Sequence, residues 1–283
     1  MVGAMKRGVV LGGGGMTGIS WEIGFMKGLR DGGVEVNEAD VVVGTSAGAM
    51  VGAQVRLGYD LERLYAAQFA PQGPPPEHLL HPDMQVMQRL MRLREADTEM
   101  TPEVCRQLGQ QAKAARAASA ETFVSEIIAQ VGAEWPAKAL VATGVDVDDG
   151  SIRGFDASAN IPLGRAVAIS MCVPGMVKPI AVGSRAYMDG GVAGSHLALA
   201  TPCDLLLALV TFEEPRTAEA AREIAATGVR VLLQAPNAES AEAMGIEPGA
   251  RFDPARRGPA AEAGHRQATA FLPQLRKAWL ADN

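Results

Sequence analysis

The spacing of hydrophobic residues changes repeatedly along the chain, which predicts strands and helices in alternation. Residues 6–11 predict a short strand, whose apolar end at 9–11 is followed by glycines. Residues 40–43 are apolar after one acidic residue, rich in β-branched side chains and followed by Gly44, as buried strands are. Behind the first stretch the apolar spacing becomes helical. The apolar positions of this helix are Met16, Ile19, Ile23, Met26 and Leu29. Alternation of this kind favours a layered α/β fold around a largely parallel sheet.

The same signals continue to the end of the chain. Helices are expected over residues 57–69, 102–131 (as one or two), 163–171 and 260–280. The runs at 205–210 and 229–233 are continuously apolar, which is typical of central parallel strands. Residues 236–258 are expected to form a loop-rich return.

A hairpin is expected where Asp-Gly stands between two β-like runs, at residues 148–151. The acidic residues Asp146, Asp148 and Asp149 miss the spacing of a calcium loop, and no glutamate ends the segment. We therefore interpret them as a solvated turn.

Composition sets outer limits on this picture. With 283 residues, 48% of them hydrophobic and 20% charged, the chain fits one large α/β domain over residues 1–283. The formal net charge of −6 argues against a nucleic-acid partner. Three widely spaced cysteines favour reduced thiols and a cytoplasmic protein. No apolar run approaches the ~18–20 residues of a membrane span. No His or Cys spacing predicts a metal site, so neither metal nor cofactor is expected.

Residues 71–120 interrupt the alternation of strands and helices. A proline-rich break at 71–76 comes first, and a methionine-rich helical face follows it. The residues on that face are Met84, Met87, Leu90 and Met91. An adaptable face of this kind suits a lid over lipid chains, whereas the commoner alternative is a face packed in the core. We interpret residues 71–120 as a helical cap inserted into the domain.

The strongest chemical signal follows the second predicted strand. Residues 44–48 read Gly-Thr-Ser-Ala-Gly, and a helical segment begins behind them. Strand, tight turn and helix is the context in which G-x-S-x-G becomes a nucleophile elbow. Small neighbours permit a strained serine, and the following helix directs its N-terminal N–H groups towards the serine oxygen. Ser46 is therefore the candidate nucleophile, with a packing turn of small residues as the alternative.

The glycine-rich loop at residues 12–18 has two functional interpretations. Gly13, Gly15 and Gly18 match the dinucleotide-binding fingerprint between a strand and a helix. That fingerprint also needs an acidic residue at the end of the second strand, and this chain has none there. Alternatively, the N–H groups of Gly13, Gly14 and Gly15 form an oxyanion hole, because no side chain blocks the approach. A third interpretation is a loop required for tight packing alone.

A candidate base lies at residue 189. Asp189 and two glycines follow a strand or hairpin arm at 180–188, so its carboxylate stands where backbone can approach closely, although Asp-Gly-Gly is also an ordinary turn. In a Ser-Asp-His triad of the α/β-hydrolase type the histidine comes last. That leaves His265, whose helical polar context gives it no catalytic setting, and the neighbours of His196 do not mark it as a base.

Taken in order, these motifs resemble the bacterial branch of the patatin-like phospholipase family. That family pairs G-G-G-x-[RK]-G, G-x-S-x-G and a distant D-G-[GA], which stand here at residues 13–18, 44–48 and 189–191. Further likeness lies at residues 168–170, 173–175 and 187–189. Three motifs in order at predicted strand ends are far more specific than any one of them.

The resemblance implies a three-layer patatin-like fold, with a mostly parallel central sheet and helices on both faces. It also implies a Ser-Asp dyad, in which Ser46 attacks an ester carbonyl and Asp189 is the base. The N–H groups of Gly13 to Gly15 would hold the oxyanion. Implied substrates are phospholipids, lysophospholipids or other fatty-acyl esters, cleaved without calcium at a membrane that the protein contacts peripherally.

The chain departs from the family pattern at Thr17, where the family usually carries arginine or lysine. The departure removes a cation from the oxyanion loop and leaves its backbone donors in place. His196 stands where an asparagine is often met. The expected activity is that of a carboxylic-ester hydrolase. The alternatives are a dinucleotide-binding protein that uses the same loop, and a catalytically silent patatin-like lipid-binding protein.

Overall fold

A computed structural model describes residues 5–71, 79, 81–96, 98–194, 196–212, 215–245, 247 and 249–280. The proline-rich break expected at 71–76 lies, apart from Pro71, outside these residues. The chain divides into two compact units. The first comprises residues 1–72, 136–140 and 196–283, and the second comprises residues 73–135 and 141–195.

Four parallel strands form the sheet of the first unit. Their order is β2 (Val41–Gly44), β1 (Arg7–Leu11), β7 (Leu205–Leu209) and β8 (Arg230–Gln234). Every residue of β7 and four of the five in β1 are buried. Such burial explains the continuous apolar runs, because central parallel strands are covered on both faces. The four strands expected in this part of the chain are confirmed to within one residue at each end.

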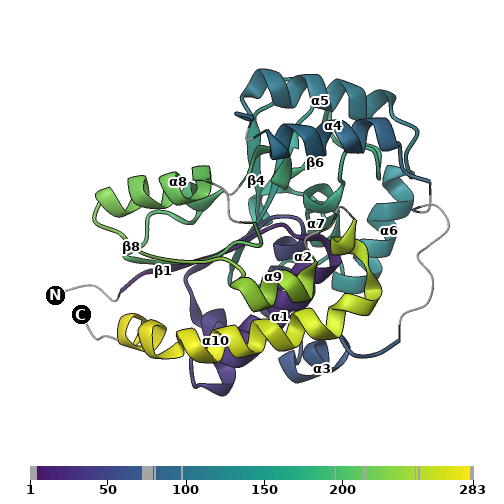
Figure 1. Cartoon of the computed structure of the whole chain (residues 1–283). Coiled ribbons are helices and arrows are strands. Elements are labelled where there is room, and N and C mark those ends of the chain that lie inside the picture. Colours follow the sequence, from purple (N-terminus) through teal and green to yellow (C-terminus); the bar gives the residue numbers. More distant parts are fainter. Residues whose placement is uncertain are drawn as a thin grey trace. The chain divides into compact units, whose positions relative to one another are not determined.

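The helices of this unit are α1 (Gly15–Asp31), α2 (Ala47–Arg56), α3 (Leu61–Ala66), α8 (Pro215–Ala226), α9 (Ala238–Met244) and α10 (Arg257–Trp279). The chain passes from β1 to β2 through α1, and in the opposite direction from β7 to β8 through α8. Because such crossovers are right-handed, α1 and α8 lie on opposite faces of this sheet, as Figure 1 shows. The return expected over 236–258 also contains α9, and α8 was not anticipated.

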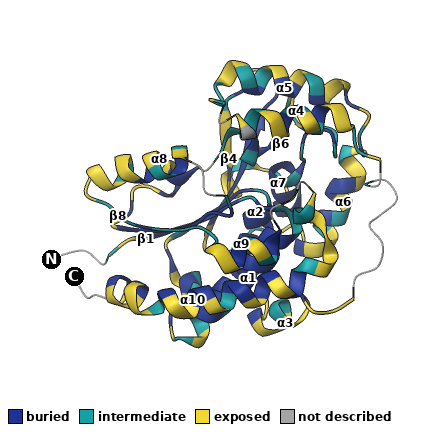
Figure 2. Cartoon of the chain, viewed as in Figure 1, coloured by how far each residue is buried: buried dark blue, intermediate teal, exposed yellow. Residues whose placement is uncertain are grey.

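Small residues allow α10 to pack closely along α1. A Cβ on Gly24 would lie 1.9 Å from the Ala261 carbonyl oxygen, and one on Gly264 would lie 2.3 Å from the Trp21 carbonyl oxygen. The two helix backbones therefore meet directly, which a larger residue at either glycine would prevent. Beside this contact the ring centroids of Trp21 and Phe25 are 5.2 Å apart. Figure 2 shows much of α1 in the dark blue of buried residues.

The strands of the second unit pair antiparallel. Here β3 (Ala139–Asp146), whose first two residues belong to the first unit, pairs with β4 (Ile152–Phe155) and with β6 (Arg185–Asp189). The short β5 (Ile180–Val182) pairs with β6. The helices are α4 (Met84–Glu95), α5 (Pro102–Ala114), α6 (Ala120–Val131) and α7 (Leu163–Met171). The β3–β4 hairpin and the two helices over 102–131 are confirmed.

The fold class expected from the sequence, an α/β fold with a mostly parallel sheet and helices on both faces, is confirmed. The assignment of residues 1–283 to one domain, with 71–120 as a cap insertion, stays a prediction. The described part of that insertion carries α4 and α5.

The methionine-rich face of α4 is buried only in part. Val86 and Leu90 are buried, whereas Met84 is 53% exposed and Met91 is 36% exposed. A stripe at i and i+4 therefore supplies the packing of this helix. The core-packing alternative is wrong for Met84 and Met91.

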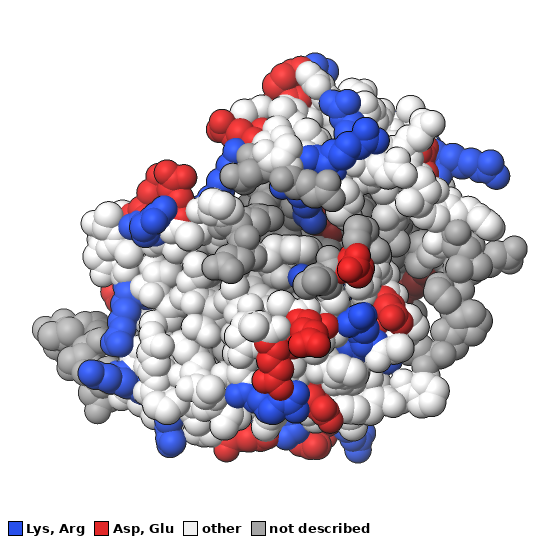
Figure 3. All heavy atoms as spheres, in the orientation of Figure 1, with Lys and Arg blue, Asp and Glu red and all other residues white. Residues whose placement is uncertain are grey.

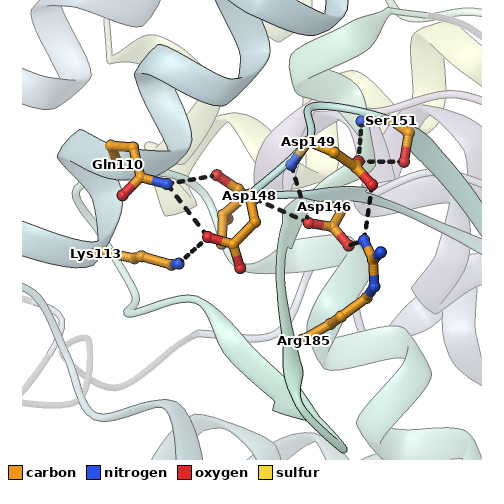
Figure 4. Close-up of polar contacts among 8 residues, drawn as sticks. Gln110, Lys113, Asp146, Asp148, Asp149, Ser151 and Arg185 are labelled. Carbon is orange, nitrogen blue, oxygen red and sulfur yellow. Dashed lines mark hydrogen bonds and ion pairs between the residues drawn. The ribbon is translucent and has the colours of Figure 1, made fainter.

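The turn between β3 and β4 carries a network of charges (Figure 4). Asp146 is fully buried, and Arg185 donates to its Oδ2 at 2.6 Å and to Asp149 Oδ2 at 2.7 Å. The backbone N–H groups of Asp148 and Asp149 donate to Asp146 Oδ1 at 2.8 and 3.3 Å, and Lys113 forms an ion pair with Asp148. The solvated-turn interpretation is thus wrong for Asp146, because its charge is buried and compensated within the unit.

On the face shown in Figure 3, basic and acidic side chains are interspersed.

Cys105, Cys172 and Cys203 are each buried and unpaired, and burial raises the pKa of the Cys105 thiol to about 11. Across the described residues, no helix combines the length and apolarity needed to cross a membrane.

Candidate functional site

Ser46 joins β2 to α2 in a backbone conformation that is rare for residues with a side chain. Its φ is 52° and its ψ is −114°. Among the described non-glycine residues, Asn160 alone shares a positive φ. Conformations of this kind cost about 1–3 kcal/mol and persist where the surroundings enforce them, often at functional sites. The strand–turn–helix context expected around this serine is confirmed, and it is the context of a nucleophile elbow.

The two glycines of the Ser46 turn are fixed by close packing. A Cβ on Gly48 would lie 2.2 Å from the Leu11 carbonyl oxygen, and one on Gly44 would lie 2.4 Å from the Gly48 carbonyl oxygen. The Gly48 N–H donates to the Gly12 carbonyl oxygen at 2.9 Å. The turn therefore packs directly against the end of β1, where the glycine-rich loop begins.

That loop presents unsatisfied backbone donors next to Ser46. A Cβ on Gly13 would lie 3.3 Å from Ser46 Cβ. The helix α1 begins after Gly14 with no side-chain cap and no acidic residue in its first turn. For the N–H groups of residues 13–17, no hydrogen-bond acceptor is found in the described chain. Adjacent free N–H groups at a helix N-terminus form a place where negative charge is stabilised.

Asp189 is the last residue of β6, in the second unit. It is 4% exposed, its Oδ1 accepts from the Gly191 N–H at 2.7 Å, and its own N–H donates to the Cys172 carbonyl oxygen at 3.1 Å. A Cβ on Gly190 would lie 2.1 Å from Thr143 Oγ1, so the backbone behind the carboxylate needs glycine. These contacts hold the carboxylate in one orientation.

Arg94, near the end of α4, makes a hydrogen bond to the turn that follows Asp189. Its Nη2 donates to the Gly191 carbonyl oxygen at 2.7 Å. No sequence signal indicates this contact, because α4 and Gly191 are separated by 97 residues.

The structure thus brings Ser46 and the glycine loop together within one unit and fixes Asp189 within the other. Pairing of Ser46 with Asp189 stays a prediction. Of the histidines, His265 pairs with Asp31 at the far end of α1, His196 is buried, and His81 is exposed. His78 lies outside the described residues.

Two residues near the glycine loop were not singled out from the sequence. Glu22 of α1 is fully buried, and neither carboxylate oxygen has a hydrogen bond of good geometry to the described chain. Burial raises the pKa of this carboxyl well above its ordinary value, and the nearby Gly12 amide lowers it by less. The Gly12 N–H already donates to the Leu209 carbonyl oxygen at 2.9 Å, so it stabilises the Glu22 carboxylate only weakly. Arg251 is the second residue, and no sequence signal points to it.

The described residues contain no group of three or more His, Cys, Asp or Glu side chains arranged to hold a metal ion. The strand β2 ends at Gly44 without an acidic residue. A dinucleotide on the glycine loop would therefore lack its usual ribose ligand.

Comparison with solved structures gives similarity at the level of the fold. VipD from Legionella pneumophila matches with 13% identity and a TM-score of 0.51, over 96% of this chain and 67% of VipD. The heterodimeric ExoU–SpcU complex from the type III secretion system of Pseudomonas aeruginosa contains a chain that matches with 16% identity and a TM-score of 0.46. That match covers 99% of this chain and 56% of the other, so the present chain spans little more than half its length.

No functionally curated protein matches this sequence. The family model described as patatin-like phospholipase matches residues 9–202, which include the glycine loop, Ser46 and Asp189. This match covers more than half of the chain. The chain therefore belongs to the patatin-like phospholipase family.

Proposed function

We propose that the protein is a serine acyl hydrolase that cleaves fatty-acyl esters of phospholipids or lysophospholipids. Membership of the patatin-like phospholipase family supports lipid-ester hydrolysis. Ser46 is the nucleophile and Asp189 is the base. The backbone N–H groups of Gly13, Gly14 and Gly15 stabilise the oxyanion.

One observation carries the proposal. Ser46 has a strained positive φ and lies against Gly13, in a loop whose N–H groups have no acceptor in the described chain. Attack on an ester carbonyl requires donors, because negative charge develops on the carbonyl oxygen. Strained backbone conformations cluster at functional sites, where the surroundings enforce them. A turn that served packing alone would not need free donors beside a strained serine.

The reaction proceeds in two halves. Ser46 Oγ attacks the ester carbonyl carbon, its proton passes to Asp189, and the loop N–H groups hold the tetrahedral oxyanion. Collapse of this intermediate expels the alcohol, which takes the proton from Asp189, and leaves an acyl group on Ser46. Water then attacks the acyl-enzyme by the same steps, and the fatty acid is released.

Such substrates lie in membranes or micelles, so the proposal includes peripheral contact with a lipid surface. Hydrolysis of a graded series of p-nitrophenyl and lysophospholipid esters tests the function. We expect turnover by the wild-type protein in excess chelator and background rates for Ser46→Ala. Equal rates for the two proteins would refute the proposal, and binding of a dinucleotide without ester turnover would favour the cofactor alternative.

A further inference from the structure

Arg251 lies near the N-terminal end of α1 with neutral partners. It belongs to the short helix η6 (Ala250–Phe252) and is partly buried. Its guanidinium donates to the Thr211 carbonyl oxygen at 3.2 Å and to Met244 Sδ at 3.6 Å, and its Cζ lies 4.6 Å from the ring centroid of Phe212. No carboxylate pairs with it within the described part of the chain. A cation that is partly removed from water without a counter-charge is costly unless an anion joins it.

The surroundings of Arg251 connect it to the glycine loop. A Cβ on Gly15 would lie 3.0 Å from the Arg251 carbonyl oxygen, so η6 packs on the first residue of α1. A Cβ on Gly14 would lie 2.6 Å from Thr211 Oγ1, so this hydroxyl is aimed at the start of α1. Thr211 is 2% exposed, and its hydroxyl has no hydrogen-bond partner in the described structure.

These groups share one chemical preference. The first turn of α1 offers free N–H groups and the positive end of a 17-residue helix. The Thr211 hydroxyl offers a further donor. The guanidinium has five N–H donors, of which two are used, and its planar fork matches the oxygens of a phosphate. A buried hydroxyl, a free helix start and a cation without a counter-charge together fit an anion.

We propose that Arg251, Thr211 and the N–H groups of residues 16–17 in the first turn of α1 bind the phosphate of an acyl-phospholipid substrate. The inference rests on the proposed hydrolase function and adds to it a preference for phosphate-bearing over neutral acyl esters. Gly13 contacts Ser46 and Gly15 contacts Arg251. Because Gly13 and Gly15 are two residues apart, their Cα atoms lie at most ~7 Å from each other. A glycerol unit bridges such a distance between an ester carbonyl and a phosphate. Arg251 also brings to the loop the positive charge that Thr17 does not carry.

Kinetics with matched substrates test the specificity. The two substrates are 1-oleoyl lysophosphatidate and 1-monooleoylglycerol, which share the acyl ester and differ in the phosphate. For Arg251→Met we expect the ratio of their kcat/KM values to fall about 10- to 100-fold, as for lost charge-assisted hydrogen bonds. Arg251→Lys keeps the positive charge but not the planar guanidinium, so its kcat/KM ratio should lie between those of the wild type and Arg251→Met. Arg266→Met, which removes an exposed arginine of α10, should keep the wild-type ratio.

Binding measured apart from catalysis separates this inference from the proposed function. Calorimetry with glycerol 3-phosphate uses the Ser46→Ala protein, with and without Arg251→Met, after circular dichroism has shown that both are folded. We expect binding by the first protein and at least a tenfold weaker binding by the second. An unchanged substrate ratio, or equal glycerol 3-phosphate binding by the two proteins, overturns the phosphate site. If the wild type hydrolyses neither ester, the hydrolase function fails and the calorimetry alone decides whether the phosphate site exists.

Discussion

His265 Nε2 lies 2.9 Å from Asp31 Oδ2, at the last residue of α1. The glycine loop and Ser46 lie at the opposite end of this 17-residue helix, about 24 Å away at 1.5 Å per residue. This histidine therefore cannot reach the serine hydroxyl while both helices are folded. A Ser-His-Asp triad that relies on His265 is excluded by the fold of the first unit alone.

The first prediction follows from that separation. We expect His265→Ala to keep most of the ester hydrolysis rate, because this histidine serves a surface contact. Asp189→Asn should reduce the rate by about 10³-fold or more, the scale seen when a member of a catalytic set is removed. The amide oxygen of the substituted side chain can still accept the Gly191 N–H, so the fold should persist. Initial rates with a p-nitrophenyl ester provide the measurement, and His196→Ala, expected to keep most activity, completes the set.

Opposite results would assign a different base. A ~10³-fold loss in His196→Ala, the scale of a lost triad member, with near wild-type activity in Asp189→Asn, would contradict the dyad. Circular dichroism of each variant separates lost chemistry from lost folding.

A second prediction concerns the packing of the Ser46 turn. Gly48→Ala places a methyl group where 2.2 Å separates it from the Leu11 carbonyl oxygen, so β1 or α2 has to shift. We expect a loss of about 1–3 kcal/mol in the free energy of unfolding, as for other overpacked sites. Equilibrium unfolding in urea measures this difference in the free energy of unfolding. In the matched control Gly18→Ala, the new methyl meets its neighbours at 3.5 Å and the helix gains up to about 1 kcal/mol. Equal stabilities for the two variants would refute the close-packing argument.

Glu22 provides a prediction about pH. Burial raises the pKa of its carboxyl well above the ordinary value of about 4.3, so the folded protein binds a proton that the unfolded chain releases. Stability from this group is therefore complete below pH ~4.3 and declines as the pH rises towards the folded pKa, by up to about 1.4 kcal/mol per pH unit. Glu22→Gln should remove the decline and raise the stability at neutral pH.

Urea midpoints between about pH 4.5 and 8, a range that starts just above the unfolded-state pKa, test the role of Glu22. The control is Glu223→Gln, on the exposed side of α8, which should follow the wild-type curve. A Glu22→Gln curve parallel to that of the wild type would show that the buried carboxyl does not control this part of the pH profile.

The charged turn of the second unit gives a further stability prediction. Arg185→Met leaves the fully buried Asp146 with its two backbone donors and without its cation (Figure 4). We expect a lower free energy of unfolding at neutral pH, because the buried carboxylate loses its charge-assisted hydrogen bond. The exposure of Arg185 keeps the loss below that of a fully buried pair. Arg153→Met, in the neighbouring strand β4, is the matched control and should change thermal stability little. A loss of the same size in both variants would assign the effect to the hairpin surface.

Local patterns predicted most of the fold, because its strands and helices are marked by short-range signals. The runs that became β1, β2, β7 and β8 are apolar and bounded by glycine or loop residues, and the turn around Ser46 is fixed by its own two glycines. The helix α8 was missed because it is short of apolar residues, with two of its residues buried. The sequence left open whether Met84 and Met91 pack in the core, because helical spacing alone does not say which residues of a face a helix buries.

The rest of the site depends on contacts between distant segments. Arg251 reaches Thr211 from 40 residues away, and Arg94 reaches Gly191 from 97 residues away. No local spacing encodes such contacts. Glu22 carried a weak signal, as an acidic residue between Trp21 and Ile23 in an apolar helix face, but its burial became evident with the packing of α1.

The central claim is that Ser46 is an activated nucleophile, and covalent labelling tests it most directly. An alkyl fluorophosphonate reacts with serines that are held against a base and an oxyanion hole. Peptide mapping by mass spectrometry then locates the adduct. We predict one phosphonyl group per chain on Ser46 in the wild-type protein and none in Ser46→Ala. An unlabelled wild-type protein, or equal labelling of another serine in both proteins, would contradict the account.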